Sequence, residues 1–550
     1  MHIDSCTTQR GGKTYRRHLL RTSYREQGKV KKRTIANLSQ CSEQEIQAIR
    51  LALQHKEDLQ QLGSAKRSLK LEQGLSVGAV ATVYQLAKRL GIVEALGTSR
   101  EAKLALWQVL ARVIGQGSRL SAVRLARQHA ACEVIGLQQG FNEEHLYANL
   151  KWVSAQQQSI ENRLFSQRYG DQRPALFLYD VTSSYLEGNA NALGAFGYNR
   201  DKKRGKQQIV IGLMSDVQGE PVTIQVFEGN THDTQTFSSQ VKKVVTRFGG
   251  ASVTFVGDRG MIKGPQMDEL QREAFHYITA LTKPQIEVLL AKGTLQMSIF
   301  DEQVGEVTLN DGCRLILKRN PVRAREISAN RASKLSAVKR EVALQNQYLE
   351  GHPRAQVATA CQKVNKKITT LKLSWVAVVA EKRCLSLQAH RAQRQEIEKL
   401  DGCYVIKTDL AKHLISKEAV HERYKDLALV EQAFRTCKTA HLEVRPVYVK
   451  LEHSTRAHVL IVMLAYKIVR ALAQCWKPFN LTVEEALQEL SMICAQNVTL
   501  HNAASSFSTV PTPNDSQQAL LRAAGVTLPD ALPVRTARVV TRKSLVSERK

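Results

Sequence analysis

The stretch 175-ALFLYDVTSSYLEG-188 decides the fold of this chain. Its first five residues are apolar or aromatic, which predicts a strand buried on both faces at the centre of a sheet. The strand ends on Asp180, where a neutral turn residue would be expected. Burial of an unpaired charge is costly. Asp180 therefore either caps the following segment or binds something positive, and both interpretations stay open at this point.

A second stretch, 252-SVTFVGDRG-260, repeats the pattern, because an apolar strand again ends on a carboxylate, Asp258. Between residues 172 and 282 the expected elements follow the order β-β-β-α-β-α-β, which is the order of a ribonuclease H-like core. The first and fourth strands of such a sheet are neighbours, so their ends lie side by side. A single Asp here is usually a turn residue, but two buried strands that both end in Asp favour a shared site.

Two carboxylates this close repel each other, and one takes up a proton unless a cation lies between them. A hard divalent cation that prefers oxygen ligands resolves the repulsion, and Mg²⁺ is the first choice. A third ligand is expected from the helix 424-YKDLALVEQAFRTCK-438. The residues that share one face of it are Tyr424, Leu427, Glu431, Arg435 and Lys438. Glu431 is the candidate, although an ordinary solvated face with Glu431 paired to Arg435 is the alternative.

Composition points to a polyanionic partner, because the net charge is +29 over 550 residues. Nucleic acid is the first expectation and an anionic membrane surface the second. The membrane interpretation is weak, since no apolar run reaches the ~18 residues of a spanning helix and the N-terminus has no signal-peptide pattern. The ten cysteines contain no Cys-x-x-Cys pair, which argues against zinc and disulfides and fits a reducing cytoplasm.

Changes of periodicity divide the chain into six expected parts, with an α/β core in the middle. Between Arg10 and Arg33 there are ten Lys or Arg residues and one acid, Glu26. The parts are a basic β-hairpin segment (1–40) with its turn near Gly28, a helical region for DNA binding or dimerisation (41–165), the first part of a ribonuclease H-like core (166–282), an α+β insertion (283–402), the second part of the core with C-terminal helices (403–500) and a loosely ordered basic tail (501–550). An ordinary helical bundle is the alternative for the second part.

Several stretches together resemble a known family, the DDE transposases of bacterial insertion sequences, of the IS-four-like type with a Tyr-Arg-Glu-Lys signature. That signature is Tyr, two residues, Arg, three residues, Glu, six residues, Lys, and it matches here at Tyr424, Glu431 and Lys438. The position of its arginine holds Leu427, so Arg423 and Arg435 are the candidates to replace it. The other stretches that resemble this family are 229-GNTHDTQTF-237, 256-VGDRGMI-262, 401-DGCYVIKTD-409 and the segment 441–466.

The resemblance implies a metal-dependent enzyme that cleaves DNA at the ends of the element and transfers the freed strands into target DNA. It implies that Asp180, Asp258 and Glu431 hold two Mg²⁺ ions, or Mn²⁺ in their place. The residues expected to contact DNA are Tyr424, Arg435, Lys438 and Arg259.

Double-stranded DNA, as element ends and target, is the expected partner, bound by a homodimer in a synaptic complex at the bacterial nucleoid in the cytoplasm. A catalytically inactive or domesticated sequence-specific DNA-binding protein is the alternative, and a ribonuclease H-like junction resolvase is a third possibility. The three carboxylates at plausible positions argue against the inactive DNA-binding protein, and the large insertion argues against the junction resolvase.

Overall fold

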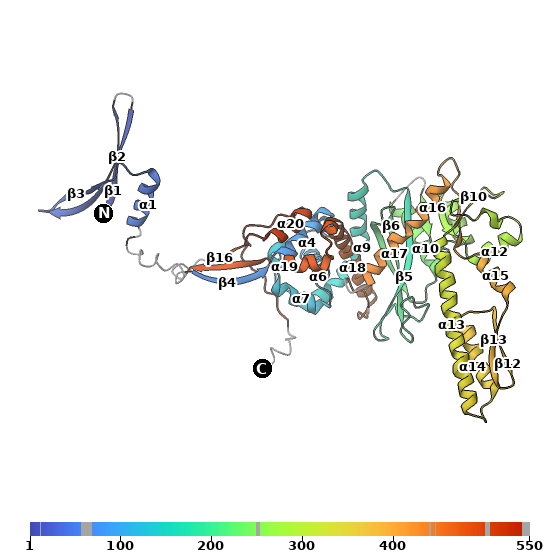
Figure 1. Ribbon diagram of the computed structural model, residues 1–550. Helices are drawn as coiled ribbons and strands as arrows, with labels where there is room; N and C mark the ends of the chain where they lie inside the picture. The colour runs from blue at the N-terminus through green and yellow to red at the C-terminus, as the bar shows by residue number, and fades with distance from the viewer. Residues whose placement is uncertain are drawn as a thin grey trace.

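A computed structural model describes residues 1–10, 13–54, 56, 69–248, 253–438, 442–445, 447–500 and 506–541. The molecule is elongated (Figure 1). An N-terminal sheet stands at one end, followed by a body of helices, a central sheet, and a protruding pair of helices with a hairpin at the other end.

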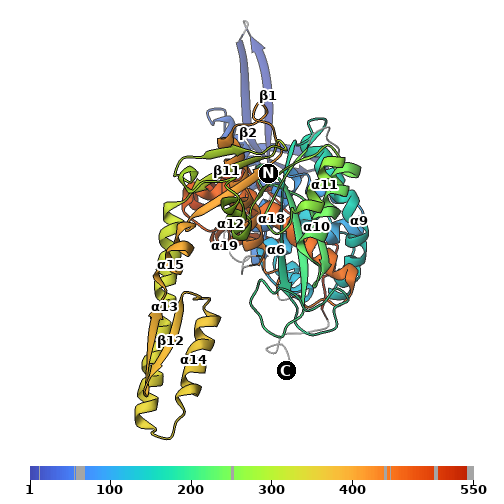
Figure 2. The same cartoon turned by 90° about the vertical axis from the view of Figure 1, so that its right-hand side faces the viewer.

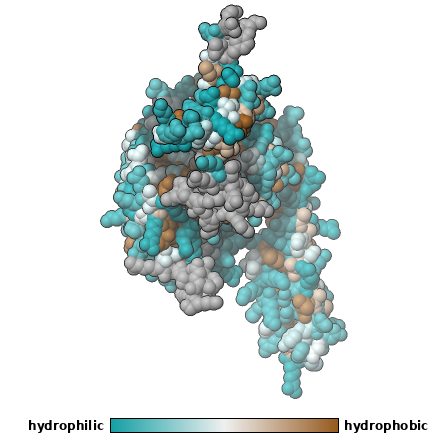
Figure 3. Space-filling model, turned by 90° about the vertical axis from the view of Figure 1, so that its left-hand side faces the viewer, coloured by the Kyte–Doolittle hydropathy of each residue, from teal (hydrophilic) through white to brown (hydrophobic). Residues whose placement is uncertain are grey.

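The N-terminal part is a three-stranded antiparallel sheet of β1 (His2–Arg10), β2 (Lys13–Glu26) and β3 (Lys29–Asn37). Its β2–β3 turn lies at Gln27 and Gly28, whose φ angles of 50° and 77° suit a two-residue hairpin and occupy the place that the sequence predicted. Helix α1 (Glu43–Gln54) follows with a capping box, because Glu45 N–H donates to Ser42 Oγ at 3.3 Å and Ser42 N–H donates to a Glu45 carboxylate oxygen at 2.7 Å. Figure 3 shows a largely hydrophilic surface at this end of the molecule.

The helical body is built around α18 (Glu452–Trp476), which contacts helices from both ends of the chain. Among the described residues, α18 alone is long and apolar enough to cross a membrane by length and composition. However, 72% of its most apolar 18-residue stretch is buried inside the protein. The helices around it are α4 (Gly78–Arg89), α5 (Ile92–Leu96), α6 (Arg100–Ile114), α7 (Arg119–Gln128), α8 (Ala131–Ile135), α9 (Glu143–Tyr169), α19 (Val483–Ser491) and α20 (Asp515–Ala523). The helices from α4 to α9 therefore share one core with the C-terminal helices, whereas α1 contacts β1 of the N-terminal sheet.

The tail also differs from the expectation, because its described part returns to this body. Strand β16 (Ser506–Thr509) pairs with β15 (Cys494–Leu500), which pairs with β4 (Leu69–Ser76). Leu520, Ala537 and Val539 are buried there. Apolar side chains spaced along a polar segment are too sparse to show a periodicity, yet they suffice to hold residues 506–541 in place. Residues 501–505 and 542–550 lie outside the described ranges.

The central sheet has eight strands in the order β10-β11-β14-β9-β8-β5-β6-β7. Its strands are β5 (Leu176–Tyr185), β6 (Gln208–Asp216), β7 (Pro221–Glu228), β8 (Thr254–Gly257), β9 (His276–Ala280), β10 (Gly305–Thr308), β11 (Arg314–Arg319) and β14 (Cys403–Thr408). Strands β5, β6 and β7 are antiparallel, whereas β5, β8 and β9 are parallel. The prediction that the first and fourth strands of the core are neighbours is thus confirmed by β5 and β8.

Side chains alternate along β5, which places its two faces against different layers. Phe177, Tyr179 and Val181 pack with Phe237 of α10 (Asp233–Lys243), and α11 (Gly264–Arg272) contacts α10. Leu178 faces the opposite layer, formed by α18 and by α17 (Leu427–Lys438). Asp180 has the parity of Leu178 and therefore faces α17.

The segment expected as an insertion divides between two places. Its hairpin of β10 and β11 pairs with β14 and extends the central sheet. The protrusion holds α13 (Pro321–Gly351), α14 (Val357–Thr370), β12 (Val376–Glu381) and β13 (Cys384–Ala389), with a hydrophobic core of its own (Figure 2). The protrusion begins directly after β11 and returns to β14 through α15 (Arg391–Lys399), whereas α12 (Lys283–Ala291) connects β9 to the hairpin of β10 and β11.

Candidate active site

The register of the sheet brings the two aspartates together. Tyr179 pairs with Gly257 across the parallel β5–β8 ladder, so Asp180 and Asp258 are the next residues on adjacent strands. Each carboxylate accepts a hydrogen bond from the next backbone N–H, Val181 at 2.7 Å and Arg259 at 2.8 Å. These bonds orient both side chains. Asp258 directly follows the end of β8, but Asp180 lies in the middle of β5, which stays paired with β6 as far as Tyr185, so the prediction that this strand ends on Asp180 is wrong.

Glu431 reaches the same place from α17, which packs against β5. The sequence predicted one helix over 424–438, but the chain breaks there: α16 (Lys417–Lys425) ends at Lys425 and α17 begins at Leu427. The break arises where the backbone N–H of Leu429 donates to the carbonyl of Asp426, three residues earlier, at 2.9 Å. Glu431 and Arg435 are both exposed, and no ion pair between them occurs among the described residues.

A hollow of about 290 Å³ contains all three carboxylates. Asp180, Asp258 and Glu431 line it, together with Arg200 and Asp233. Burial first, and then the negative charges of Asp258 and Glu431, raise the pKa of Asp180 to about 7, while the Val181 N–H and the Arg200 cation act in the opposite direction. Asp258 and Glu431 are themselves exposed.

The donor set suits a hard divalent cation, because three carboxylates from different elements face one small volume and repel one another. As the side chains are placed, no three His, Cys, Asp or Glu residues within the described ranges are grouped closely enough to hold an ion. The three carboxylates therefore suit a divalent cation by their chemistry and by lining one hollow, but their side chains stand too far apart here to coordinate one together.

The four residues expected to contact DNA lie in different surroundings. Tyr424 is half-buried and its hydroxyl donates to Asp258 Oδ1 at 3.4 Å; burial and then the Asp258 charge raise its pKa. Arg259 and Arg435 are exposed beside the carboxylates in the sequence. Lys438 points elsewhere, since its Nζ donates to Asp201 Oδ1 at 2.8 Å and its side chain is 11% exposed.

Asp201 is the centre of a small ion-pair network. It accepts hydrogen bonds from Lys438, from Arg445 and from the backbone N–H of Tyr185 at 3.1 Å. Asp201 lies in the β5–β6 loop (residues 186–207) next to Arg200. Lys438 therefore ties this loop to α17.

Arg200 is the site residue that sequence reasoning missed. Its Nη2 donates to both carboxylate oxygens of Asp233 at 2.8 Å, and its backbone N–H donates to Ser183 Oγ at 2.8 Å. The signature position Leu427 is buried in the core instead, and Arg423 is paired with Asp426 at 3.1 Å. The sequence contained one indication of this pair, because Asp233 lies in the stretch 229–237 quoted above. No local sequence feature, however, links Asp233 to Arg200.

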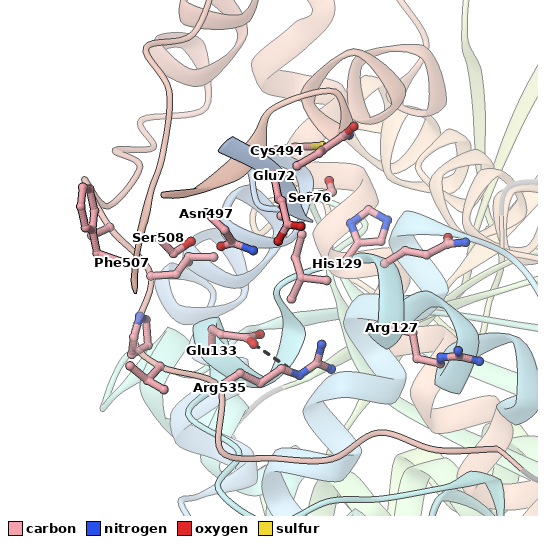
Figure 4. A pocket seen from close by; sticks show the side chains of 18 of the residues that line it. Glu72, Ser76, Arg127, His129, Glu133, Cys494, Asn497, Phe507, Ser508 and Arg535 are labelled. Carbon is pink, nitrogen blue, oxygen red and sulfur yellow. Dashed lines mark hydrogen bonds and ion pairs between the residues drawn. The ribbon is translucent and has the colours of Figure 1, made fainter. Parts of the chain in front are cut away.

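A larger hollow lies elsewhere, in the helical body (Figure 4). It measures about 1060 Å³ and is lined by residues of β4, β15 and β16 and by His129, Glu133 and Arg535. The carboxylate of Glu133 lies 3.5 Å from Arg535 Nε. This hollow shares no residue with the carboxylate site, so the volume of a hollow does not by itself identify the candidate active site.

Two family models match the chain. The "Transposase DDE domain" matches residues 171–468, which is more than half of the chain, and the "IS1634 family transposase, N-terminal domain" matches residues 3–66. Among solved structures, a piggyBac transposase synaptic complex with hairpin DNA is similar with 9% sequence identity and a TM-score of 0.35, over 72% of this chain and 70% of that chain. None of the curated proteins matches the chain.

Proposed function

The chain belongs to the insertion-sequence DDE transposases, and from this premise we propose that it cleaves DNA strands at the ends of its element and joins them to target DNA. The observation that carries the proposal is the single hollow lined by Asp180, Asp258 and Glu431, which arrive from β5, β8 and α17. The strand order around β5 supports a ribonuclease H-like core.

The three carboxylates would hold two Mg²⁺ ions, or two Mn²⁺ ions. Divalent ions, when bound, supply the charge that activates water and stabilises the leaving oxygen in phosphodiester cleavage. The ring hydroxyl of Tyr424 donates to Asp258 and so orients that carboxylate. The Val181 and Arg259 N–H groups orient Asp180 and Asp258 from the backbone.

Arg200 is the cation that we assign to the reacting phosphate. Asp233 holds Nη2 of its guanidinium, which leaves Nη1 to donate to a phosphate oxygen. Charge that develops on those oxygens is stabilised most by a donor already fixed in place. Lys438 has a positioning role in this scheme, since it anchors the loop through Asp201, while Arg259 and Arg435 contact the DNA further out.

The N-terminal sheet and the helical body are proposed to bind the element ends. The region 1–40 carries much of the excess positive charge, and phosphate contacts of this kind make binding fall steeply with salt. Two copies would hold two ends in a synaptic complex in the bacterial cytoplasm.

The experiment is strand cleavage by Glu431→Gln on a duplex that carries the native element end. The variant keeps the size of the side chain and removes the charge, so cleavage in Mg²⁺ is expected to fall by at least a hundredfold while end binding persists. Glu418→Gln, an exposed carboxylate on α16, is the matched control and should cleave normally. Cleavage by Glu431→Gln at the parental rate would refute the proposal.

A further inference from the structure

A small hollow lies in the helical body, where α6, α7 and α18 meet (Figure 1). It measures about 10 Å³, which is room for one particle about the size of a water molecule. It shares no residue with the carboxylate site or with the hollow of Figure 4. We call it the arginine hollow, because it is lined by Arg112 of α6 and Arg119 of α7, together with Ile461 of α18.

The two arginines of this hollow are buried without a carboxylate beside them. Arg112 is 7% exposed and Arg119 is 6% exposed, yet neither forms an ion pair with a residue that the structure describes. The charge of Glu443 acts on Arg112, but Glu443 is exposed. Arg314 is equally buried and differs in this respect, because its Nε donates to Glu306 at 2.6 Å. A buried charge with no opposite charge beside it is costly, so the arginine pair requires a counter-ion.

The hydrogen bonds of Arg119 go to neutral groups. Its Nε donates to Gln108 Oε1 at 3.1 Å, and its Nη1 lies 3.2 Å from His458 Nδ1. Because His458 Nε2 lies 3.2 Å from the carbonyl oxygen of Val444, Nε2 carries the proton and Nδ1 accepts from Arg119. Burial, and then the charges of Arg119 and Arg112, lower the pKa of His458, so this ring is neutral. Nη2 of Arg119 has no partner among the described residues.

An anion satisfies this site better than a water molecule does. Burial first, and then the charge of Arg112, lower the pKa of Arg119 to about 9, so the guanidinium is still charged at neutral pH. A water molecule accepts a hydrogen bond from Nη2, whereas an anion accepts that bond and also balances the charge. The hollow lies at the N-terminal end of α7, where Ser118 is the N-cap and its Oγ accepts from the Ser121 N–H at 3.2 Å. The helix dipole is positive at this end and adds to the attraction.

We propose that the arginine hollow binds one monatomic anion, such as chloride, beside the guanidinium groups of Arg112 and Arg119. The volume suits an ion of this kind rather than a phosphate group. The bound ion would stabilise the junction between the N-terminal helices α6 and α7 and the C-terminal helix α18. The inference goes beyond the proposed function and does not depend on it.

The first test measures the binding of chloride alone to the full-length protein, by the broadening of the chlorine nuclear magnetic resonance line. The parent should give a component that saturates as chloride is titrated. Arg119→Met, which keeps the bulk of the side chain and removes its charge and donors, should lose that component. Arg127→Met removes one positive charge from the exposed side of the same helix and should keep it. This matched control subtracts the chloride that gathers at a basic surface.

The second test measures stability. Chloride is exchanged for gluconate, which is too large for the hollow, at constant ionic strength, and thermal unfolding is followed by far-UV circular dichroism. A ligand that binds the native state alone stabilises it, so chloride should raise the melting temperature of the parent by about 2 °C or more. Arg127→Met should show the same rise and Arg119→Met none. General effects of the two salts act on all three proteins and cancel in the comparison.

The proposal does not depend on whether Arg119→Met folds, because the line broadening of the parent is measured without any variant. A parent with no saturable component refutes the proposal and assigns water to the hollow. A saturable component that persists in a folded Arg119→Met places the ion elsewhere and also refutes it. If a duplex that carries the element end abolishes the component that depends on Arg119, a DNA phosphate competes for these arginines, and the proposal of a resident monatomic ion is overturned.

Discussion

Replacement of Asp180 by asparagine separates the effect of the Asp180 charge on stability from its effect on strand cleavage. In the absence of metal, burial and two neighbouring carboxylates raise the pKa of Asp180 from its ordinary value of 3.8 to about 7. The native protein then binds more protons at this group than the unfolded chain does. Its stability therefore falls as the pH rises from about 4 to about 7, and changes no further above that window.

The magnitude follows from the two pKa values. The difference between 3.8 and about 7 corresponds to about 4 kcal/mol of lost stability when Asp180 is ionised. Asp180→Asn has no charge to lose, so at pH 8 without metal it should be more stable than the parent by up to about 4 kcal/mol. At pH 4 the two proteins should be equally stable. Mg²⁺ should raise the stability of the parent more than that of the variant.

The assay is urea unfolding at pH 4 and pH 8, with and without Mg²⁺, beside strand cleavage. A buried aspartate with partners is the matched control: Asp216 accepts hydrogen bonds from Arg168 at 3.0 Å and from the Tyr169 hydroxyl at 2.7 Å. Asp216→Asn should therefore destabilise the protein at pH 8, the opposite sign. Cleavage by Asp180→Asn should fall by orders of magnitude in Mg²⁺. A variant that cleaves well, or that is less stable than the parent at pH 8, would contradict the reasoning.

Two further predictions concern the parts around the site. Asp201→Asn should weaken the ion pair with Lys438 that holds the β5–β6 loop, and so lower the cleavage rate about tenfold or more with little change in end binding. If Lys438 instead binds DNA, its release from Asp201 should tighten DNA binding, which a salt titration of the affinity would detect. Removal of residues 1–56 should leave the urea midpoint of the remaining protein unchanged and abolish the preference for element ends over random DNA. Removal of residues 1–140 should instead unfold the helical body, because β4 and α4 to α8 pack with the C-terminal elements. Far-UV circular dichroism of the two deletion variants distinguishes these outcomes.

Much of the candidate site could be predicted from the sequence because its evidence is local. An apolar run followed by a carboxylate predicts both a strand and a polar residue on it, and this happens twice, at Asp180 and Asp258, although β5 continues past Asp180 to Tyr185. Chain order then limits the sheet to few arrangements, in which β5 and β8 are neighbours. Glu431 followed from helical spacing, even though the expected helix is two helices.

Other features could not be predicted because they depend on contacts between residues far apart in the chain. Nothing near residue 200 indicates that Arg200 meets Asp233, or that Asp201 withdraws Lys438 from the site. The hairpin of β10 and β11 reads as an independent hairpin in sequence, and only its pairing with β14 places it in the central sheet. The apolar pattern of α18 says that the helix is buried but not which helices bury it.

The sequence by itself indicated the core strands around Asp180 and Asp258, most of the helices, the candidate carboxylates and a polyanionic partner, since periodicity, spacing and net charge are properties of short segments or of the whole composition. The tertiary structure decided which cation faces the carboxylates, which one is sequestered, and which loop forms the wall beside them. Those outcomes depend on the burial and pairing of charges. The position of a charged side chain depends on which opposite charges lie near it, and only the folded chain brings those charges close.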